Sequence, residues 1–157
     1  MIKPSKSPIT LPRRLAPLAL LLLASANLYA QQPMSISLSG AAEVPPVTTS
    51  AKGSGQITVL PDRTVSGSIK VSGFVPTMAH IHEAAVGKNG PPIITLTQTA
   101  SDSFAVPAGA RLTDAQYTSF TSGELYVNVH SAQYPNGEIR AQLLRSEAGA
   151  TPTRAGY

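Results

Sequence analysis

Apolar and polar residues alternate along several short segments after residue 30, as they do in strands that bury one face of a sheet. The pattern is clearest in residues 55–60 (GQITVL) and 65–71 (VSGSIKV), and it also occurs in residues 32–40 (QPMSISLSG). Pro-Asp-Arg at positions 61–63 separates the first two segments and is typical of a turn, so we expect them to form a hairpin.

Four further segments have strand character and form two more pairs. They are residues 77–83 (TMAHIHE) with 93–99 (IITLTQT), and residues 124–130 (ELYVNVH) with 138–144 (EIRAQLL). The first pair encloses a loop at 87–92 in which two prolines exclude a helix. The second pair encloses Asn136 and Gly137, a strong turn signal. Repeated short strands joined by turns are typical of an all-β domain.

Residues 112–120 (LTDAQYTSF) have helical spacing instead. Thr113 can cap the amino end, Asp114 favours the first turn, and Gly123 ends the helix. We therefore predict an all-β, Ig-like fold, an antiparallel β-sandwich or Greek-key barrel, with one short helix across one end of a sheet.

The first 30 residues have the order of a secretory signal peptide. Four basic residues precede an apolar run at 15–24 (LAPLALLLLA), and small residues follow it. We expect cleavage after Ala30, or alternatively after Ala26, and a periplasmic or extracellular protein. No Cys follows either position, so we expect no stable membrane anchor. The expected domain covers residues 31–145, and the polar segment 146–157 is expected to be a flexible tail.

Removal of the signal peptide changes the charge of the chain. The whole sequence has 12 Lys and Arg against 8 Asp and Glu, but residues 1–30 contain four of the basic residues and no acidic one. The remaining chain is formally neutral and has no basic block, which excludes a nucleic-acid partner. The sequence contains no Cys, so an exported domain of this size depends on its core, or on its core and a metal.

All three histidines of the chain lie in two of the predicted strands. His80 and His82 are two residues apart, so they share one face of their strand at a Cα separation of about 6.5–7 Å. His130 ends residues 124–130 on the polar face. Two imidazoles at this spacing can converge on one cation, and His130 from a neighbouring strand would complete a site. Imidazole ligands suit copper and zinc, so we expect His80, His82 and His130 to be candidate metal ligands.

Other interpretations of these histidines stay open. A histidine on a half-buried sheet face is commonly satisfied by a nearby amide or carboxylate, and Asn128 and Glu83 are available for that role. A pH switch is a further alternative, although nothing in the sequence marks an element with two states. Met78 shares the face of His80 and is a candidate soft fourth ligand, but methionine beside a sheet more often packs against apolar neighbours.

The polar faces of the last two strands supply further candidates. Tyr126 and Asn128 are expected outward, beside His130, as supporting hydrogen-bond donors. Arg140 is expected outward as well, paired on the surface with Glu83 or Glu138. No Ser/His/Asp set, paired acids or Gly-rich phosphate loop can be assembled, which excludes the common hydrolase and nucleotide-binding classes.

Four motifs together resemble the CHRD domain, a chordin-type domain that also occurs as a single secreted domain in bacteria. They are GAAEVPP (40–46), AHIHEAAVGKNGPPII (79–94), LTDAQY (112–117) and GELYVNVHSAQYPNGEIRAQL (123–143). The resemblance extends from about residue 35 to residue 144. It implies an Ig-like β-sandwich or barrel in an exported protein, without a particular chemistry.

A second resemblance concerns the histidines. The H-x-H strand and the later V-H are similar to the copper-ligand positions of copper/zinc superoxide dismutases, which would place His80, His82 and His130 on copper and Arg140 as an anion-guiding arginine. The chain departs from that family because it has no fourth bridging histidine, no zinc loop and no disulfide. We therefore expect a binding module with a copper or zinc ion. The alternatives are a dismutase-like copper redox enzyme and a metal-free structural or adhesion module, and the sequence indicates no particular protein partner.

Overall fold

The computed structural model describes residues 33–145, so the predicted signal peptide and C-terminal tail lie outside the described residues. The described chain forms nine strands, one α-helix (α1, Asp114–Thr121) and one 3-10 turn (η1, Gly40–Ala42). The strands are β1 (Met34–Ser39), β2 (Lys52–Val59), β3 (Val65–Ser72), β4 (Pro76–Glu83), β5 (Pro92–Thr95), β6 (Thr97–Ala100), β7 (Ser103–Ala105), β8 (Leu125–Ser131) and β9 (Ile139–Gln142). The predicted all-β fold with one short helix is confirmed.

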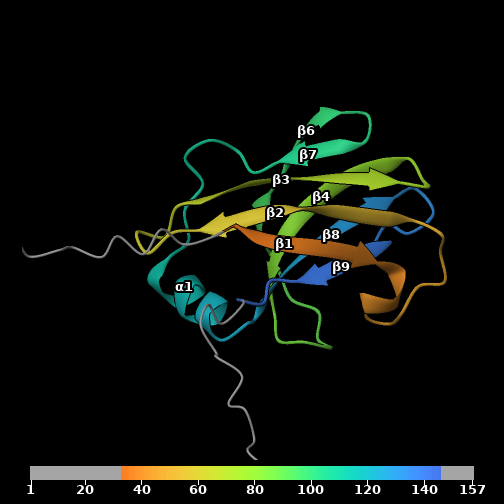
Figure 1. Cartoon of the computed structure of the whole chain (residues 1–157). Helices are drawn as coiled ribbons and strands as arrows, with labels where there is room; N and C mark the ends of the chain where they lie inside the picture. The colour runs from red at the N-terminus through yellow and green to blue at the C-terminus, as the bar shows by residue number, and fades with distance from the viewer. Residues whose placement is uncertain (1–32, 146–157) are drawn as a thin grey trace, which may run out of the picture.

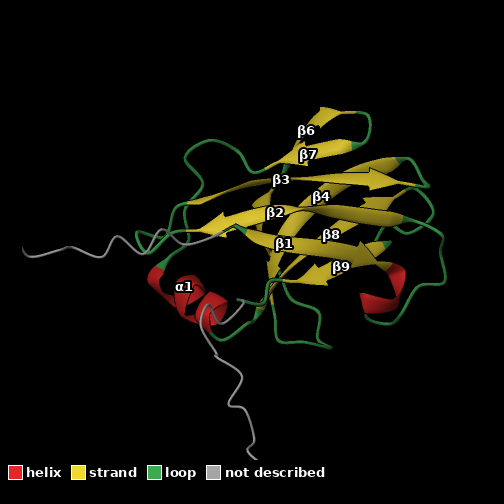
Figure 2. Cartoon of the chain, viewed as in Figure 1, coloured by secondary structure: helices red, strands yellow, loops and turns green. Residues whose placement is uncertain are grey.

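The strands form one sheet in the order β5-β4-β8-β9-β1-β2-β3-β7-β6, with every pair antiparallel. The sheet curls until β4 and β8 lie behind β2 and β3 (Figures 1 and 2). Its two edges are consecutive in the chain, because only Leu96 separates β5 from β6. The backbone N–H of Leu96 still donates to Ala79 of β4 at 2.9 Å. The sheet is therefore nearly closed into a barrel.

The inner faces of the strands supply the apolar core. The alternation predicted for β1, β2, β3 and β8 places one side of each strand in this core. Its members include Ile36, Leu38, Ile57, Ile69, Ala79, Ile81, Val127 and Val129, each exposed by less than a tenth. Burial of each Val, Leu or Ile side chain stabilises the fold by about 1.5–3 kcal/mol. The core residues of β4 and β8 therefore determine which side chains of these strands lie on the opposite face of the sheet.

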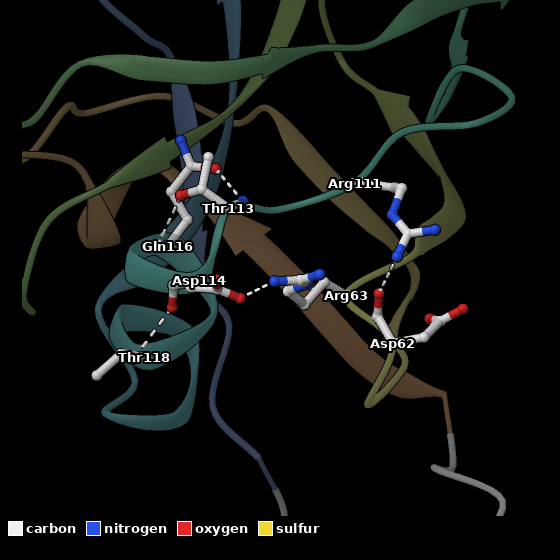
Figure 3. Close-up of polar contacts among 7 residues, drawn as sticks. All are labelled: Asp62, Arg63, Arg111, Thr113, Asp114, Gln116 and Thr118. Atoms are coloured by element: carbon white, nitrogen blue, oxygen red, sulfur yellow. Dashed lines mark hydrogen bonds and ion pairs between the residues drawn. The ribbon is translucent and has the colours of Figure 1, made fainter.

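The helix α1 begins where the sequence predicts. The side chain of Thr113 accepts a hydrogen bond from the backbone N–H of Gln116, and the backbone N–H of Thr113 donates to the side-chain oxygen of Gln116. The two bonds form a capping box (Figure 3). Asp114 forms an ion pair with Arg63 from the β2–β3 turn, which ties the helix to the end of the sheet (Figure 3). Among the described residues, no helix is long and apolar enough to cross a membrane.

Several boundaries differ from the sequence prediction. The single strand predicted at 93–99 is two strands, because at Leu96 the chain stops pairing with β4 and turns to pair with β7. The pattern also missed β7, which has only three residues, and the first three residues of β2, which contain glycine and serine instead of an apolar alternation. Short, polar strands depend on their neighbours for pairing and leave a weak signal in the sequence.

Candidate metal centre

The three histidines come from two adjacent strands, β4 and β8. In the antiparallel register His80 lies opposite Asn128, and His130 lies opposite Met78. His130 is therefore the diagonal neighbour of His80, within reach of a long side chain on the same face. Ala79 and Ile81 point into the core from the same strand, so the imidazoles are directed to the other side of the sheet.

The structure brings the three imidazoles together. One ligand nitrogen from each of His80, His82 and His130 lies within 4.8 Å of the other two. The closest pair, Nδ1 of His80 and Nε2 of His130, is 3.0 Å apart. Nitrogens that share a tetrahedral ion at 2.0–2.1 Å are about 3.3 Å apart, so a small adjustment of side chains would place all three on one cation.

Backbone carbonyl groups bind the Nδ1 atoms of two of the rings, on the side that faces away from the cluster. Nδ1 of His82 lies 2.9 Å from the carbonyl oxygen of Gly90, and Nδ1 of His130 lies 2.9 Å from that of Pro135. Each ring therefore presents its Nε2 to the cluster. A backbone acceptor on the far nitrogen is the usual support of a metal-binding histidine, because it fixes both the tautomer and the ring orientation.

The hydrogen bonds also determine which ring nitrogens carry a proton in the metal-free cluster. Nδ1 of His130 donates to Pro135, so Nε2 of the neutral ring has the lone pair, and the proton between the two rings belongs to Nδ1 of His80. Nε2 of His82 is buried and makes no hydrogen bond of good geometry, although the side chain of Asn128 lies close enough to raise the pKa of the ring. An unsatisfied buried polar atom costs about 1–3 kcal/mol, a cost that a bound cation would remove.

The electrostatic environment keeps the cluster neutral. Burial lowers the pKa of all three imidazoles below the usual 6.5. The neighbouring imidazoles lower the pKa of His80 further, whereas the carbonyls of Gly90 and Pro135 partly oppose the effect of burial at His82 and His130. Neutral imidazole is the form that binds a metal, so the cluster is ready to do so at pH 7.

Two of the other candidate residues lie in different surroundings. The side chain of Met78, opposite His130, is 47% exposed, so it lies at the solvent side of the cluster. Glu83 accepts a hydrogen bond from Ser119 of α1 at 2.6 Å and so serves the contact between helix and sheet. The expectation that Glu83 would satisfy a histidine or pair with Arg140 is therefore wrong.

The face that carries the histidines is covered, although the sequence predicted an exposed face. Every residue of β8 is buried, including Tyr126 and Asn128. Two loops lie over this face and are joined by a 2.6 Å hydrogen bond from the side chain of Asn89 to the carbonyl oxygen of Val44. The loops are residues 84–91 and residues 40–51. Loop packing depends on contacts distant in sequence, which strand alternation does not reveal.

Arg140 differs most from its prediction. It is 2% exposed and forms no surface ion pair with Glu83 or Glu138. Its Cζ lies 3.4 Å from the ring centroid of Tyr126, and its nitrogens donate to the side-chain oxygens of Asn89 and Gln142. A guanidinium buried in this way is not placed to guide an anion from solvent, so that expectation is wrong as well.

Tyr126 links the arginine to the candidate metal centre. Its ring stacks on His82 with a centroid distance of 4.8 Å and an interplanar angle of 11°. Because β8 lies between β4 and β9, the Tyr126 ring has His82 on the side of β4 and Arg140 on the side of β9. We refer to His82, Tyr126 and Arg140 as the stacked column.

Glu43 is a buried residue whose place near this column the sequence did not reveal. It is 6% exposed, and its Oε1 has no hydrogen-bond partner. Burial raises the pKa of Glu43 to about 7, against the attraction of Arg140 and a backbone hydrogen bond, which lower it. A carboxyl group beside two prolines in a loop gave only a weak signal, because its burial depends on the fold of residues 40–51.

A family model of the CHRD domain matches residues 34–143. The match covers more than half of the sequence, and the chain belongs to the CHRD domain family. Membership supports a binding module of unspecified kind. No curated protein and no solved structure is significantly similar to the chain.

Proposed function

We propose that this CHRD domain is an exported module that binds one copper or zinc ion through His80, His82 and His130. The observation that supports it best is the convergence of the three ligand nitrogens within 4.8 Å, with two rings held from behind by backbone carbonyls. The donor set is three neutral imidazoles, which suits copper and zinc and does not suit calcium or magnesium.

The surroundings favour binding over catalysis. His82 and His130 are buried, whereas His80 is partly exposed and Met78 is exposed. A dismutase-like reaction would benefit from a positive charge at this opening, but Arg140 is buried behind Tyr126. The site therefore supports metal buffering or delivery better than turnover of a small anion.

Export is part of this proposal and has its own test. The basic residues and the apolar run of the first 30 residues support it. We expect the chain in the exported fraction to begin at Gln31 or Asn27. A chain that stays inside the cell with residues 1–30 attached would contradict this part and leave the metal centre unaffected.

Metal titration of the purified protein tests the centre itself. We expect one zinc or copper ion per chain, and we expect replacement of any single histidine by alanine to lower the affinity more than the about 10–100-fold typical of changes behind a ligand. The chain contains no other histidine, so no second imidazole site can compete. Thr77→Ala, an exposed change on the same strand, is the matched control. Equal metal uptake by the triple alanine variant would refute the site.

Gly90 provides a test of the backbone support. A Cβ at position 90 would collide with the backbone carbonyl oxygen of Glu83, so Gly90→Ala must displace the loop and with it the carbonyl group that holds His82. We expect a loss of about 10–100-fold in metal affinity, measured by competition with a chromophoric chelator.

The control lies in the same loop. Gly87 has a φ of 75° and open space around its Cβ position, so Gly87→Asn suits the left-handed backbone and its Cβ meets no neighbouring atom. We expect this variant to bind metal as the wild type does. Equal affinities of the Gly90→Ala variant and the Gly87→Asn variant would show that the Gly90 carbonyl does not support His82.

A further inference from the structure

Arg140 places a buried positive charge beside the candidate metal centre. The guanidinium stays protonated in proteins, and no carboxylate among residues 33–145 lies within ion-pair distance of it. Its hydrogen bonds go to the neutral oxygens of Asn89 and Gln142, at 3.3 and 3.1 Å. The charge is therefore held in place without being neutralised by a direct partner.

The stacked column brings this charge close to one metal ligand. The guanidinium lies 3.4 Å from the centre of the Tyr126 ring, which stacks on His82. A positive charge at this place repels a cation bound to His82 in proportion to the charge of that cation.

The ligands themselves do not offset this repulsion. Imidazole ligands carry no negative charge, and Glu83, the acidic residue of β4, is directed by strand alternation to the opposite face, where it accepts a hydrogen bond from Ser119 of α1. A divalent ion in the cluster therefore experiences about twice the repulsion from Arg140 that a monovalent ion does. The thioether of Met78, exposed and opposite His130, is in addition a soft donor of the kind that selects Cu(I).

We propose that Arg140 makes the cluster selective for monovalent copper over divalent zinc. This inference rests on the proposed function, because it concerns which ion the three histidines hold. Arg140 acts through its charge behind Tyr126 and does not contact the ion. Asn89 and Gln142 fix the position of the guanidinium, and the column fixes its distance from His82.

The test compares the affinities for two ions in charge-changing variants. The dissociation constants are measured for Cu(I), kept reduced with ascorbate in competition with bicinchoninate, and for Zn(II) in competition with a chromophoric chelator. We expect Arg140→Met, which can still pack on Tyr126, to lower the preference for Cu(I) over Zn(II) on the order of tenfold. Arg140→Lys keeps the charge and is expected to keep most of the preference.

Glu43 supplies a variant of opposite sign. The charge of its carboxylate interacts with Arg140, so Glu43→Gln, with both affinities measured at a pH well above the Glu43 pKa of about 7, removes a negative charge near the guanidinium and is expected to increase the preference for Cu(I). This change is isosteric, and it provides a second measurement if Arg140→Met folds poorly. The lower preference expected for Arg140→Met and the higher preference expected for Glu43→Gln both follow from the change in charge.

The outcomes separate this inference from the proposed function. Equal changes in Arg140→Lys and Arg140→Met, or an unchanged preference in Glu43→Gln, would show that the arginine has only a structural role and would overturn the inference. Binding of neither ion by the wild type would overturn the proposed function and this inference with it. Opposite shifts of the preference for Cu(I) over Zn(II) in Arg140→Met and Glu43→Gln would support the inference.

Discussion

Replacement of Tyr126 by alanine is expected to lower the free energy of unfolding by about 4 kcal/mol. The ring is 2% exposed and lies between His82 and Arg140, so its removal opens a cavity that the rigid strands on both sides cannot fill. It also deprives the buried guanidinium of its aromatic partner, and an uncompensated buried charge is strongly destabilising. Urea unfolding of the metal-free protein measures the effect.

Two further variants identify the cause of this loss. Tyr126→Phe removes only the hydroxyl that accepts the backbone N–H of Gly90 at 3.3 Å, and it should cost about 1 kcal/mol. In a double-mutant cycle with Arg140→Met, part of the cost of Tyr126→Ala should disappear, because no buried charge then remains to be stabilised. Additive effects of the two changes would show that the contact between ring and guanidinium contributes nothing.

The face of β4 and β8 on which the three histidines lie can be predicted from the sequence. Side chains alternate along a strand, so an apolar Ala79 and Ile81 directed to the core force His80 and His82 to the other face. The same argument applied to β8 directs His130 away from Val127 and Val129. What alternation does not supply is the register, and it is the pairing of Met78 with His130 that makes the three rings neighbours.

The covering of that face could not be predicted in the same way. The loops at 40–51 and 84–91 have no periodic pattern, and their positions depend on single contacts such as that between Asn89 and Val44. Without those loops, Arg140 on a polar face is expected in solvent with a carboxylate partner. With them, its partners are an aromatic ring and two amide oxygens. Arg140 is therefore buried, and not on the surface, because the two loops cover its face of the sheet.

Buried polar groups around the column have opposite effects on the pH dependence of stability. The histidines have lowered pKa values, so the stability that they contribute is complete above pH 6.5 and is lost as the pH falls. Glu43 has a pKa raised to about 7, so it favours the folded state below pH 4.5, and this contribution is lost as the pH rises through 7.

Glu43→Gln is therefore expected to stabilise the protein at high pH and to change little at low pH. At pH 4 the carboxyl group is largely protonated in both the folded and the unfolded chain, so the neutral amide replaces a neutral acid. Between pH 4.5 and 7 the unfolded chain releases a proton that the folded chain keeps, which costs the wild type up to about 3 kcal/mol by pH 9. Because the histidines are the same in both proteins, their effect cancels in the difference between wild type and variant.

Urea unfolding of the two metal-free proteins at several pH values between 4 and 9 measures that difference. Glu124→Gln removes an exposed carboxylate and controls for the loss of one negative charge elsewhere on the molecule. A Glu43→Gln effect that is the same at pH 4 and pH 9 would mean that the carboxyl group ionises as readily in the folded protein as in the unfolded one. The negative charge would then be present beside Arg140 at every pH well above 4.5, and the net positive charge near His82 would be smaller than the buried position of Glu43 implies.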